Sequence, residues 1–216
     1  MRIMDKEQFW HALLRRSYQN ERFKIKQSEE EVKSFLYMAY YKEVEDRRST
    51  FIEDEATKEM IAKAAKWLTA DLKPGLLIYG GVGNGKTTLA KAICKTIGIL
   101  YDSPYSNERK GVYRISALDV AKCASDPEAF TRLKNQELLF IDDIGTEPAN
   151  IKSWGNEISP VTELLYSRYD RLLFTLMTSN LNEDELRERY GLRIADRMAE
   201  MFERLYYSHR SYRSTP

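Results

Sequence analysis

Apolar positions recur with helical spacing in the first third of the chain, where residues 1–70 contain neither glycine nor proline. In residues 29–48, "EEEVKSFLYMAYYKEVEDRR", Val32, Leu36 and Tyr40 follow one another every four residues. This spacing is typical of a helix that buries one face.

A capping box is predicted at the start of this helix, because Ser28 is followed three residues later by Glu31. A second helix is expected over residues 54–71. We therefore predict a helical extension over 1–54 and a main domain over 55–216. Charge is uneven along the extension, which fits either solvated helix faces or a segment that docks a partner protein.

From Pro74 onward, short continuous apolar runs alternate with helical segments. Such runs are typical of parallel strands that are covered on both faces, so the pattern predicts an α/β fold. The predicted strands are 76–80, 111–117, 138–143, 172–180 and 205–213, and the clearest predicted helices between them are 87–97 and 159–170.

Composition narrows the class of protein further. The formal net charge of +1 provides no general attraction to nucleic acid or membrane. The two cysteines, Cys94 and Cys123, lack metal-ligand spacing and are expected to be buried in a reduced, intracellular protein. The longest apolar runs are too short to cross a bilayer, so we expect a cytoplasmic protein.

The strongest motif lies at the first strand–helix junction, "LLIYGGVGNGKTT", which matches the phosphate-binding P-loop pattern G-x-x-x-x-G-K-[ST]. Glycines let backbone N–H groups curl around an anion, and the helix N-terminus adds further donors. Lys86 would reach the β- and γ-phosphates of ATP, and the Thr87 hydroxyl would hold Mg²⁺. The predicted phosphate site comprises Gly80, Gly81, Val82, Gly83, Asn84, Gly85, Lys86, Thr87 and Thr88.

Two adjacent carboxylates end the next strongly apolar run, "LLFIDD". In a P-loop fold this strand ends beside the phosphate loop. Asp142 would then hold Mg²⁺ through its water shell, and Asp143 would orient and polarise the attacking water. Many ATPases of this type have glutamate at the second position, and aspartate is one methylene shorter.

Polar residues also end the following strand, "FTLMTSN". Asn180 can lie between the predicted base and the γ-phosphate and act as a sensor. A turn former or helix cap is the alternative interpretation.

The stretch "YGLRIADRMAEM" carries Arg193 and Arg197 four residues apart, which places both on one helix face. Ile194, Met198 and Met201 can anchor the other face to the core. The pattern alone is that of a surface helix. A γ-phosphate elsewhere in the assembly would give the arginines a target.

Taken in order, "GGVGNGKTTLAKAI", "LLFIDDIGTE", "LMTSN" and "YGLRIADRMAEMF" resemble the AAA+ ATPases of the DnaC/IstB type over residues 55–216. The resemblance implies a P-loop three-layer sandwich with a central parallel five-stranded sheet, a short helical extension and no full helical lid. It also implies ATP and Mg²⁺ as ligands, and side-by-side assembly on single-stranded DNA. Such proteins load a replicative helicase or assist a transposase.

The resemblance assigns roles residue by residue. Arg197 matches the arginine that reaches the ATP of a neighbouring subunit, and Arg193, one turn earlier, assists it. Arg213 is a weaker candidate for a phosphate sensor within the same subunit. The remaining matches are Lys86 and Thr87 for phosphate and Mg²⁺, Asp142 and Asp143 for metal and water, and Asn180 as the sensor.

Contacts to single-stranded DNA are less specific in this sequence. Basic residues lie among aromatic ones near the second strand, and such a mixture can neutralise phosphates and stack bases. An ordinary polar loop explains them equally well. The candidates are Tyr105, Arg109, Lys110, Tyr113 and Arg114.

Other functions stay open. A nucleotide-switched scaffold with little turnover is compatible with the short Asp143 side chain. A transposition helper would share the same site, and a small-molecule P-loop kinase is a weaker alternative. A GTPase is disfavoured because no N-K-x-D motif occurs. The residues before the P-loop show no zinc-ligand pattern, which leaves the helicase partner undetermined.

Overall fold

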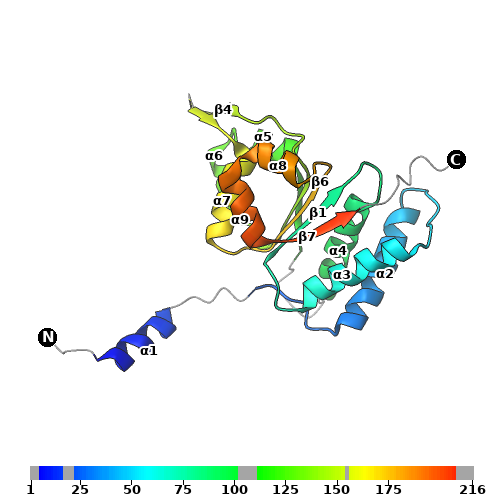
Figure 1. Cartoon of the computed structure of the whole chain (residues 1–216), viewed down its shortest axis with the longest axis horizontal. Helices are drawn as coiled ribbons and strands as arrows, with labels where there is room; N and C mark the ends of the chain where they lie inside the picture. Colours follow the sequence, from blue (N-terminus) through cyan, green and yellow to red (C-terminus); the bar gives the residue numbers. More distant parts are fainter. Residues whose placement is uncertain (1–4, 17–21, 102–110, 154–155, 208–216) are drawn as a thin grey trace.

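The computed structural model describes residues 5–16, 22–101, 111–153 and 156–207. Its centre is a sheet of five parallel strands in the order β2-β3-β6-β1-β7, with helices on both faces (Figure 1). The predicted α/β three-layer sandwich is therefore confirmed. The strands are β1 (Gly75–Gly80), β2 (Tyr113–Ser116), β3 (Leu139–Ile144), β6 (Thr175–Ser179) and β7 (Phe202–Tyr207).

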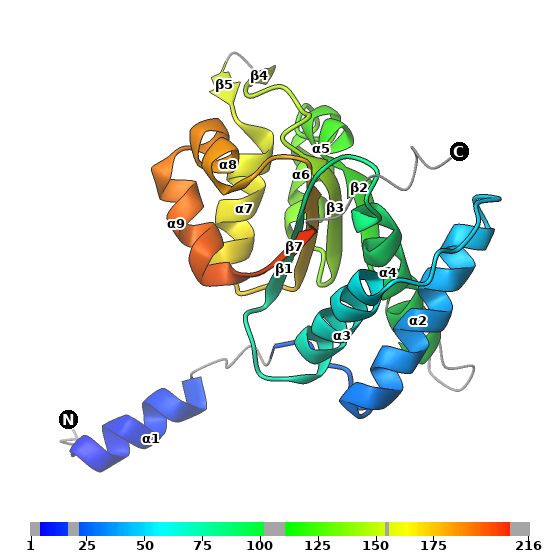
Figure 2. The same cartoon turned by 45° about the vertical axis from the view of Figure 1, so that its right-hand side comes forward.

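The sheet separates two hydrophobic cores, because successive side chains of a strand point to opposite faces. In β1, Leu76 and Ile78 pack into one core, and Leu77 and Tyr79 into the other. The first face is covered by α2 (Glu29–Glu45), α3 (Glu55–Thr69) and α4 (Lys86–Tyr101). The second is covered by α5 (Ala117–Cys123), α6 (Pro127–Lys134), α7 (Pro160–Asp170), α8 (Glu183–Tyr190) and α9 (Leu192–Met201) (Figure 2).

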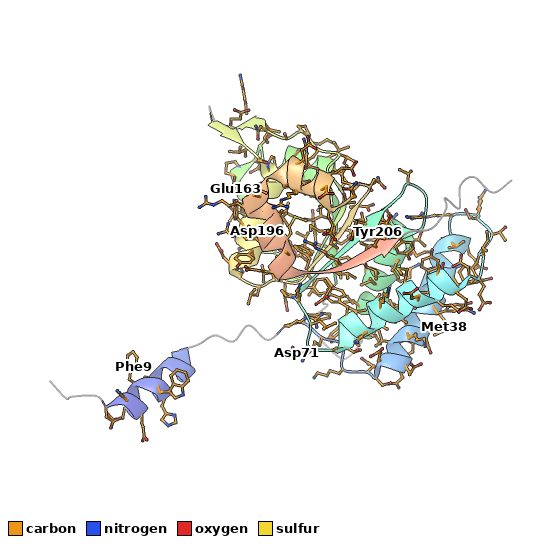
Figure 3. All side chains as sticks on the ribbon, viewed as in Figure 1. Phe9, Met38, Asp71, Glu163, Asp196 and Tyr206 are labelled. Carbon is orange, nitrogen blue, oxygen red and sulfur yellow. The ribbon has the colours of Figure 1, made fainter. Side chains whose placement is uncertain are left out.

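Helix α2 belongs to the first core. Ser28 and Glu31 form the predicted capping box, and Val32 and Leu36 are fully buried against α3 and α4. In contrast, α1 (Lys6–Arg16) stands clear of the body, with Phe9 exposed at its surface (Figure 3). The domain boundary at residue 54 stays a prediction, but α2 covers the first core of the sheet rather than standing apart from it.

Several details differ from the sequence prediction: the strands predicted over 111–117 and 172–180 are shorter, and helix α8 was not predicted. The fifth strand begins at Phe202, earlier than predicted, because Phe202 pairs with Gly75 although the apolar pattern of the preceding helix runs into it. Residues 208–213 of that prediction lie outside the described residues. The connection after β2 folds as α5 and α6, and an unpredicted antiparallel hairpin, β4 (Ile151–Ser153) with β5 (Asn156–Ile158), follows β3.

Cys94 is buried as expected, whereas Cys123 is only half-buried at the end of α5. Burial raises the pKa of the Cys94 thiol to about 12, so this side chain behaves as a small apolar residue at neutral pH. Within the part of the chain that the structure describes, no helix combines the length and the apolar character that crossing a bilayer requires.

Candidate functional site

The P-loop connects β1 to α4 and turns sharply at glycines. Gly80, Gly83 and Gly85 have φ angles of 135°, 81° and 98°, a region that side chains with a Cβ rarely adopt. Helix α4 begins at Lys86, so its unsatisfied N-terminal N–H groups face the loop. The local sequence thus builds the glycine-rich cradle that the motif predicts, and anion binding there stays a prediction.

The end of β7 closes tightly against this loop. A Cβ added to Gly80 would lie 2.2 Å from the backbone oxygen of Tyr207. The fully buried Asn84 side chain donates to the same oxygen at 3.1 Å, and its own oxygen accepts from Lys86 Nζ at 3.2 Å. Asn84 therefore fixes the loop to the sheet, a role that the motif does not reveal.

We expect Gly80→Ala to lower the free energy of unfolding by about 1–3 kcal/mol, since it combines a strained φ with a backbone clash. Gly81→Ala is the matched control, because its added Cβ would meet nothing closer than Asn84 Nδ2 at 4.0 Å. Urea unfolding without nucleotide measures both variants. Equal stability of the two would contradict the close approach of β7 to the P-loop.

Lys86 is the buried centre of the site, with a relative exposure of 4%. Its ammonium donates to Gly80 O at 2.9 Å, Gly81 O at 2.6 Å and Asn180 Oδ1 at 2.9 Å. These oxygens hold the cation in the cradle, where phosphate oxygens can replace some of them without a large movement of the side chain.

Asp142 lies between two hydroxyl groups. Its Oδ1 accepts from Thr87 Oγ1 at 3.0 Å and from Thr178 Oγ1 at 2.6 Å. The predicted pair of Thr87 and Asp142 is therefore brought together from α4 and β3. Thr178 was not assigned a role from the sequence, because a threonine inside a strand carries no distinctive pattern.

A bulge in β3 separates the two carboxylates. Ile141 pairs with Met177 and Ile144 with Ser179, so Asp142 and Asp143 together oppose Thr178 alone. Asp143 has a φ of 56°, a conformation that aspartate tolerates better than most residues, and its N–H donates to Thr178 Oγ1 at 2.9 Å. Such bulges re-aim side chains, and here the bulge turns Asp143 toward the cavity beside the P-loop.

Asn180, at the end of β6, links the two halves of the site. Its Oδ1 accepts from Lys86, and its Nδ2 lies 3.5 Å from Asp143 Oδ1. The lysine, the amide and the second carboxylate were predicted as separate motifs and meet here. Their catalytic roles stay predictions.

A cavity of about 760 Å³ opens over the P-loop. Its floor is formed by residues 82–88 with Asp143 and Asn180, and another wall comes from the end of α2 and the connection to α3. This volume is in the range of small-molecule sites. The residues of that second wall are Tyr40, Val44, Arg47, Ser49, Thr50, Phe51, Ile52 and Thr57.

The donor set beside the cavity fits Mg²⁺ better than a metal with an all-protein cage. Among the residues that the structure describes, no group of three or more His, Cys, Asp or Glu could enclose a metal ion. One hydroxyl, on Thr87, and one carboxylate, on Asp142, lie together. Mg²⁺ keeps several waters and takes further oxygens from substrate phosphates, so two protein groups are sufficient.

The two arginines of α9 lie away from their own P-loop. Neither Arg193 nor Arg197 is among the residues that line the cavity. Arg193 is exposed, and the half-buried Arg197 guanidinium lies 4.2 Å from the ring centroid of Tyr166 and 5.1 Å from that of Tyr169. The structure thus does not bring these residues to the phosphate site of the same chain.

Of the predicted DNA contacts, Tyr113 and Arg114 are exposed on the edge strand β2. Tyr105, Arg109 and Lys110 lie outside the described residues, as does Arg213.

Solved structures with the same fold include replication proteins. The DnaC helicase loader aligns with a TM-score of 0.57 at 20% identity, over 74% of this chain and 94% of that one. DnaI aligns with a TM-score of 0.52 at 19% identity, over 73% of this chain and 87% of that one. The replication initiator DnaA, bound to AMPPCP and single-stranded DNA, aligns with a TM-score of 0.51 at 21% identity, over 74% of this chain and 50% of that one.

At these identities the likeness concerns the fold alone. No curated protein sequence matches the chain. The profile of the ATPase family associated with various cellular activities (AAA) matches residues 76–201, more than half of the 216 residues. This match spans β1, the P-loop, both carboxylates, Asn180 and α9, and the chain therefore belongs to the AAA family of ATPases.

Proposed function

We propose that the chain binds ATP with Mg²⁺ in the cavity over the P-loop and hydrolyses it when a neighbouring subunit supplies Arg197. The proposal rests on one observation, the meeting of Lys86, Asn180 and Asp143. The Asn180 amide is within 2.9 Å of the lysine cation and 3.5 Å of the carboxylate. The Asn180 side chain thereby connects the cation that would bind a phosphate, Lys86, with the carboxylate that would act as the base for water, Asp143.

In this proposal Asp143 accepts the proton of the attacking water, and Asn180 holds that water in place. Lys86 offsets the negative charge that spreads over the transferring phosphoryl group. Thr87 and Asp142 hold Mg²⁺, which when bound supplies further positive charge to the phosphates. Thr178 keeps the Asp142 carboxylate in place through its short hydrogen bond of 2.6 Å.

The base of the nucleotide is assigned to the second wall of the cavity, where Tyr40, Val44, Phe51 and Ile52 provide apolar and aromatic surface. Phe51 makes edge-on contacts with Tyr40, at a ring-centroid distance of 6.1 Å. The phosphates then lie on the P-loop, at the opposite side of the same cavity. Residues before position 55 would therefore take part in nucleotide binding.

Arg197 is assigned to the site of a neighbouring subunit because it lies outside its own cavity. An arginine donated in this way stabilises transition-state charge that Lys86 alone does not neutralise. A lone subunit should then hydrolyse ATP slowly. ATP bound between two subunits would bridge their surfaces, so the nucleotide would control assembly.

We further assign the assembly to DNA replication, on single-stranded DNA and in the manner of a helicase loader. This rests on analogy of fold with proteins described as a helicase loader and as an initiator bound to single-stranded DNA. The exposed pair Tyr113 and Arg114 on β2 offers an aromatic ring and a cation for such a strand. A transposition helper would use the same ATP site with a different partner.

One observation favours a second candidate, a nucleotide-switched scaffold with little turnover. The Asp143 side chain is one methylene shorter than the glutamate of many related ATPases, and its contact with Asn180 is long, at 3.5 Å. In a scaffold, ATP binding would still drive assembly while hydrolysis stayed slow.

The ATPase rate per subunit is expected to rise with protein concentration and with added single-stranded DNA, because each active site needs a second subunit. Steady-state phosphate release over a dilution series measures this, with light scattering to report assembly. A flat rate together with ATP-dependent assembly would instead establish the scaffold. A flat rate without assembly would contradict the proposal.

A further inference from the structure

Glu147 is a buried carboxylate in the loop that follows the two aspartates of β3. Its relative exposure is 4%, and a buried carboxylate is costly unless it is hydrogen-bonded. Its Oε2 accepts from the Gly145 N–H at 2.8 Å, and its Oε1 accepts from the Tyr190 hydroxyl at 2.6 Å. One side chain therefore joins this loop to the last residue of α8.

Arg189 strengthens the same connection. Its guanidinium donates to the backbone oxygen of Glu147, and its Nη2 lies 3.8 Å from the carboxylate. Burial, and then the nearby Glu147 carboxylate, raise the pKa of Tyr190 far above its usual value. The phenol therefore stays protonated and donates throughout the range in which the protein would work.

The loop is held to the catalytic strand at its other end. Thr146 Oγ1 donates to the backbone oxygen of Asp143 at 2.7 Å, and Ser179 Oγ donates to that of Ile144 at 2.9 Å. Gly145 has a φ of 97°, and a Cβ there would lie 2.4 Å from Leu181. The loop thus has little freedom relative to the ends of β3 and β6.

Helix α9 begins directly beyond this connection. Tyr190 ends α8, Gly191 turns the chain with a φ of 81°, and α9 starts at Leu192. A Cβ at Gly191 would meet nothing within 4 Å, so no neighbour packs on that side of the turn, and backbone hydrogen bonds join Gly191 to Arg187 and Ala195. Helix α9 lies beside α8 in Figure 2 and also contacts α7 and β7. Its far end is held by hydrogen bonds from Tyr169 to Glu200 and from Lys73 to the backbone oxygen of Ala199, so the anchored end of α8 is what holds its start. The buried face of α9 consists of Ile194, Met198 and Met201.

We propose that Glu147 is a positioning residue, which through Tyr190 holds the start of α9 at the angle that presents Arg197 to a neighbouring subunit. This inference rests on the proposed donation of Arg197 between subunits. It predicts that breaking the connection harms a subunit as an arginine donor while leaving its own nucleotide site able to turn over.

A mixture of two variants separates arginine donation from turnover at a subunit's own nucleotide site. Asp143→Asn subunits keep Arg197 but lack the base, and asparagine tolerates the positive φ of this position. Arg197→Ala subunits keep a complete nucleotide site but donate nothing. In the mixture, turnover comes from the Arg197→Ala sites next to Asp143→Asn donors.

Tyr190→Phe in the donor subunits is expected to lower the restored turnover about tenfold, as a small misplacement of a catalytic group does. Glu147→Gln in the donor should act in the same direction. Tyr190→Phe in the acceptor subunits should leave turnover within about twofold of that of the parent mixture, because the donated Arg197 then comes from a subunit in which the connection to α9 is intact. Tyr206→Phe, at an exposed tyrosine of β7, is the matched control in the donor.

The outcomes distinguish the two proposals. An inert mixture of the two parent variants would overturn the donation of Arg197, and with it this inference. An active mixture that Tyr190→Phe leaves unchanged in the donor, or lowers equally in donor and acceptor, would overturn the positioning role alone. Thermal unfolding of each variant verifies that the subunits are folded. If the Glu147→Gln subunit does not fold, the milder Tyr190→Phe change still tests the positioning role.

Discussion

Lys86→Ala is expected to abolish ATP-dependent assembly and to weaken ATP binding about 10- to 100-fold. The Lys86 ammonium is buried among oxygens of the P-loop and Asn180, whereas Arg47, the other described cation that lines the cavity, belongs to its second wall. A hydrogen bond to a charged group contributes about 1.5–3 kcal/mol, and every 1.4 kcal/mol changes the affinity about tenfold. Without this charge, the phosphates lose the buried cation at the centre of the P-loop.

Lys91→Ala on the same helix is the matched control, since Lys91 is half-buried but does not line the cavity. Calorimetric titration with a non-hydrolysable ATP analogue measures binding, and light scattering measures assembly. Normal ATP binding by a folded Lys86→Ala protein would remove the basis for assigning the P-loop as the nucleotide site.

Arg197→Ala is expected to lower ATP hydrolysis by about 10³–10⁵-fold while leaving ATP binding by a single subunit unchanged. Its guanidinium lies over Tyr166 and Tyr169, away from its own cavity, so its loss removes no contact there. The charge that it would offset develops only in the transition state, and the effect should therefore fall on turnover rather than on binding.

Adding Asp143→Asn subunits should partly restore turnover to Arg197→Ala subunits, because each variant supplies what the other lacks. Arg187→Ala removes an exposed arginine of α8 and is the control for Arg197→Ala. It should keep the ATP hydrolysis rate of the unmodified protein. Single-turnover phosphate release at saturating ATP measures the chemical step. No restoration at any mixing ratio would contradict donation between subunits.

Much of the fold could be predicted because it depends on short-range pattern. The P-loop needs glycines at particular places between a strand and a helix, and Gly80 and Gly85 with Lys86 and Thr87 meet that need within eight residues. Continuous apolar strands such as 138–143 predicted a sheet covered on both faces, and both cores are present. The start of β7 was missed, because the apolar pattern of α9 runs into the strand and only its pairing with β1 separates them.

The site divides in the same way between local and long-range causes. The sequence alone indicated which residue types take part: a lysine, two aspartates and an asparagine at the ends of successive elements. The geometry between them comes from contacts across many residues. Asp142 and Asp143 point differently because β3 bulges against Thr178, and Asn84 holds the P-loop by bonding Tyr207 on a strand far along the chain.

Two further features depend wholly on the tertiary structure. The connection between α2 and α3, which the sequence suggested was part of an extension, forms a wall of the cavity because α2 packs on α4. Glu147 and Tyr190 look like ordinary surface residues in the sequence, yet they meet in a partly buried hydrogen bond. The sequence by itself determined the local backbone and the chemistry of each motif, because these depend on neighbours within a few residues. Only the packed fold decided which motifs face one another, because burial and pairing are settled between distant segments.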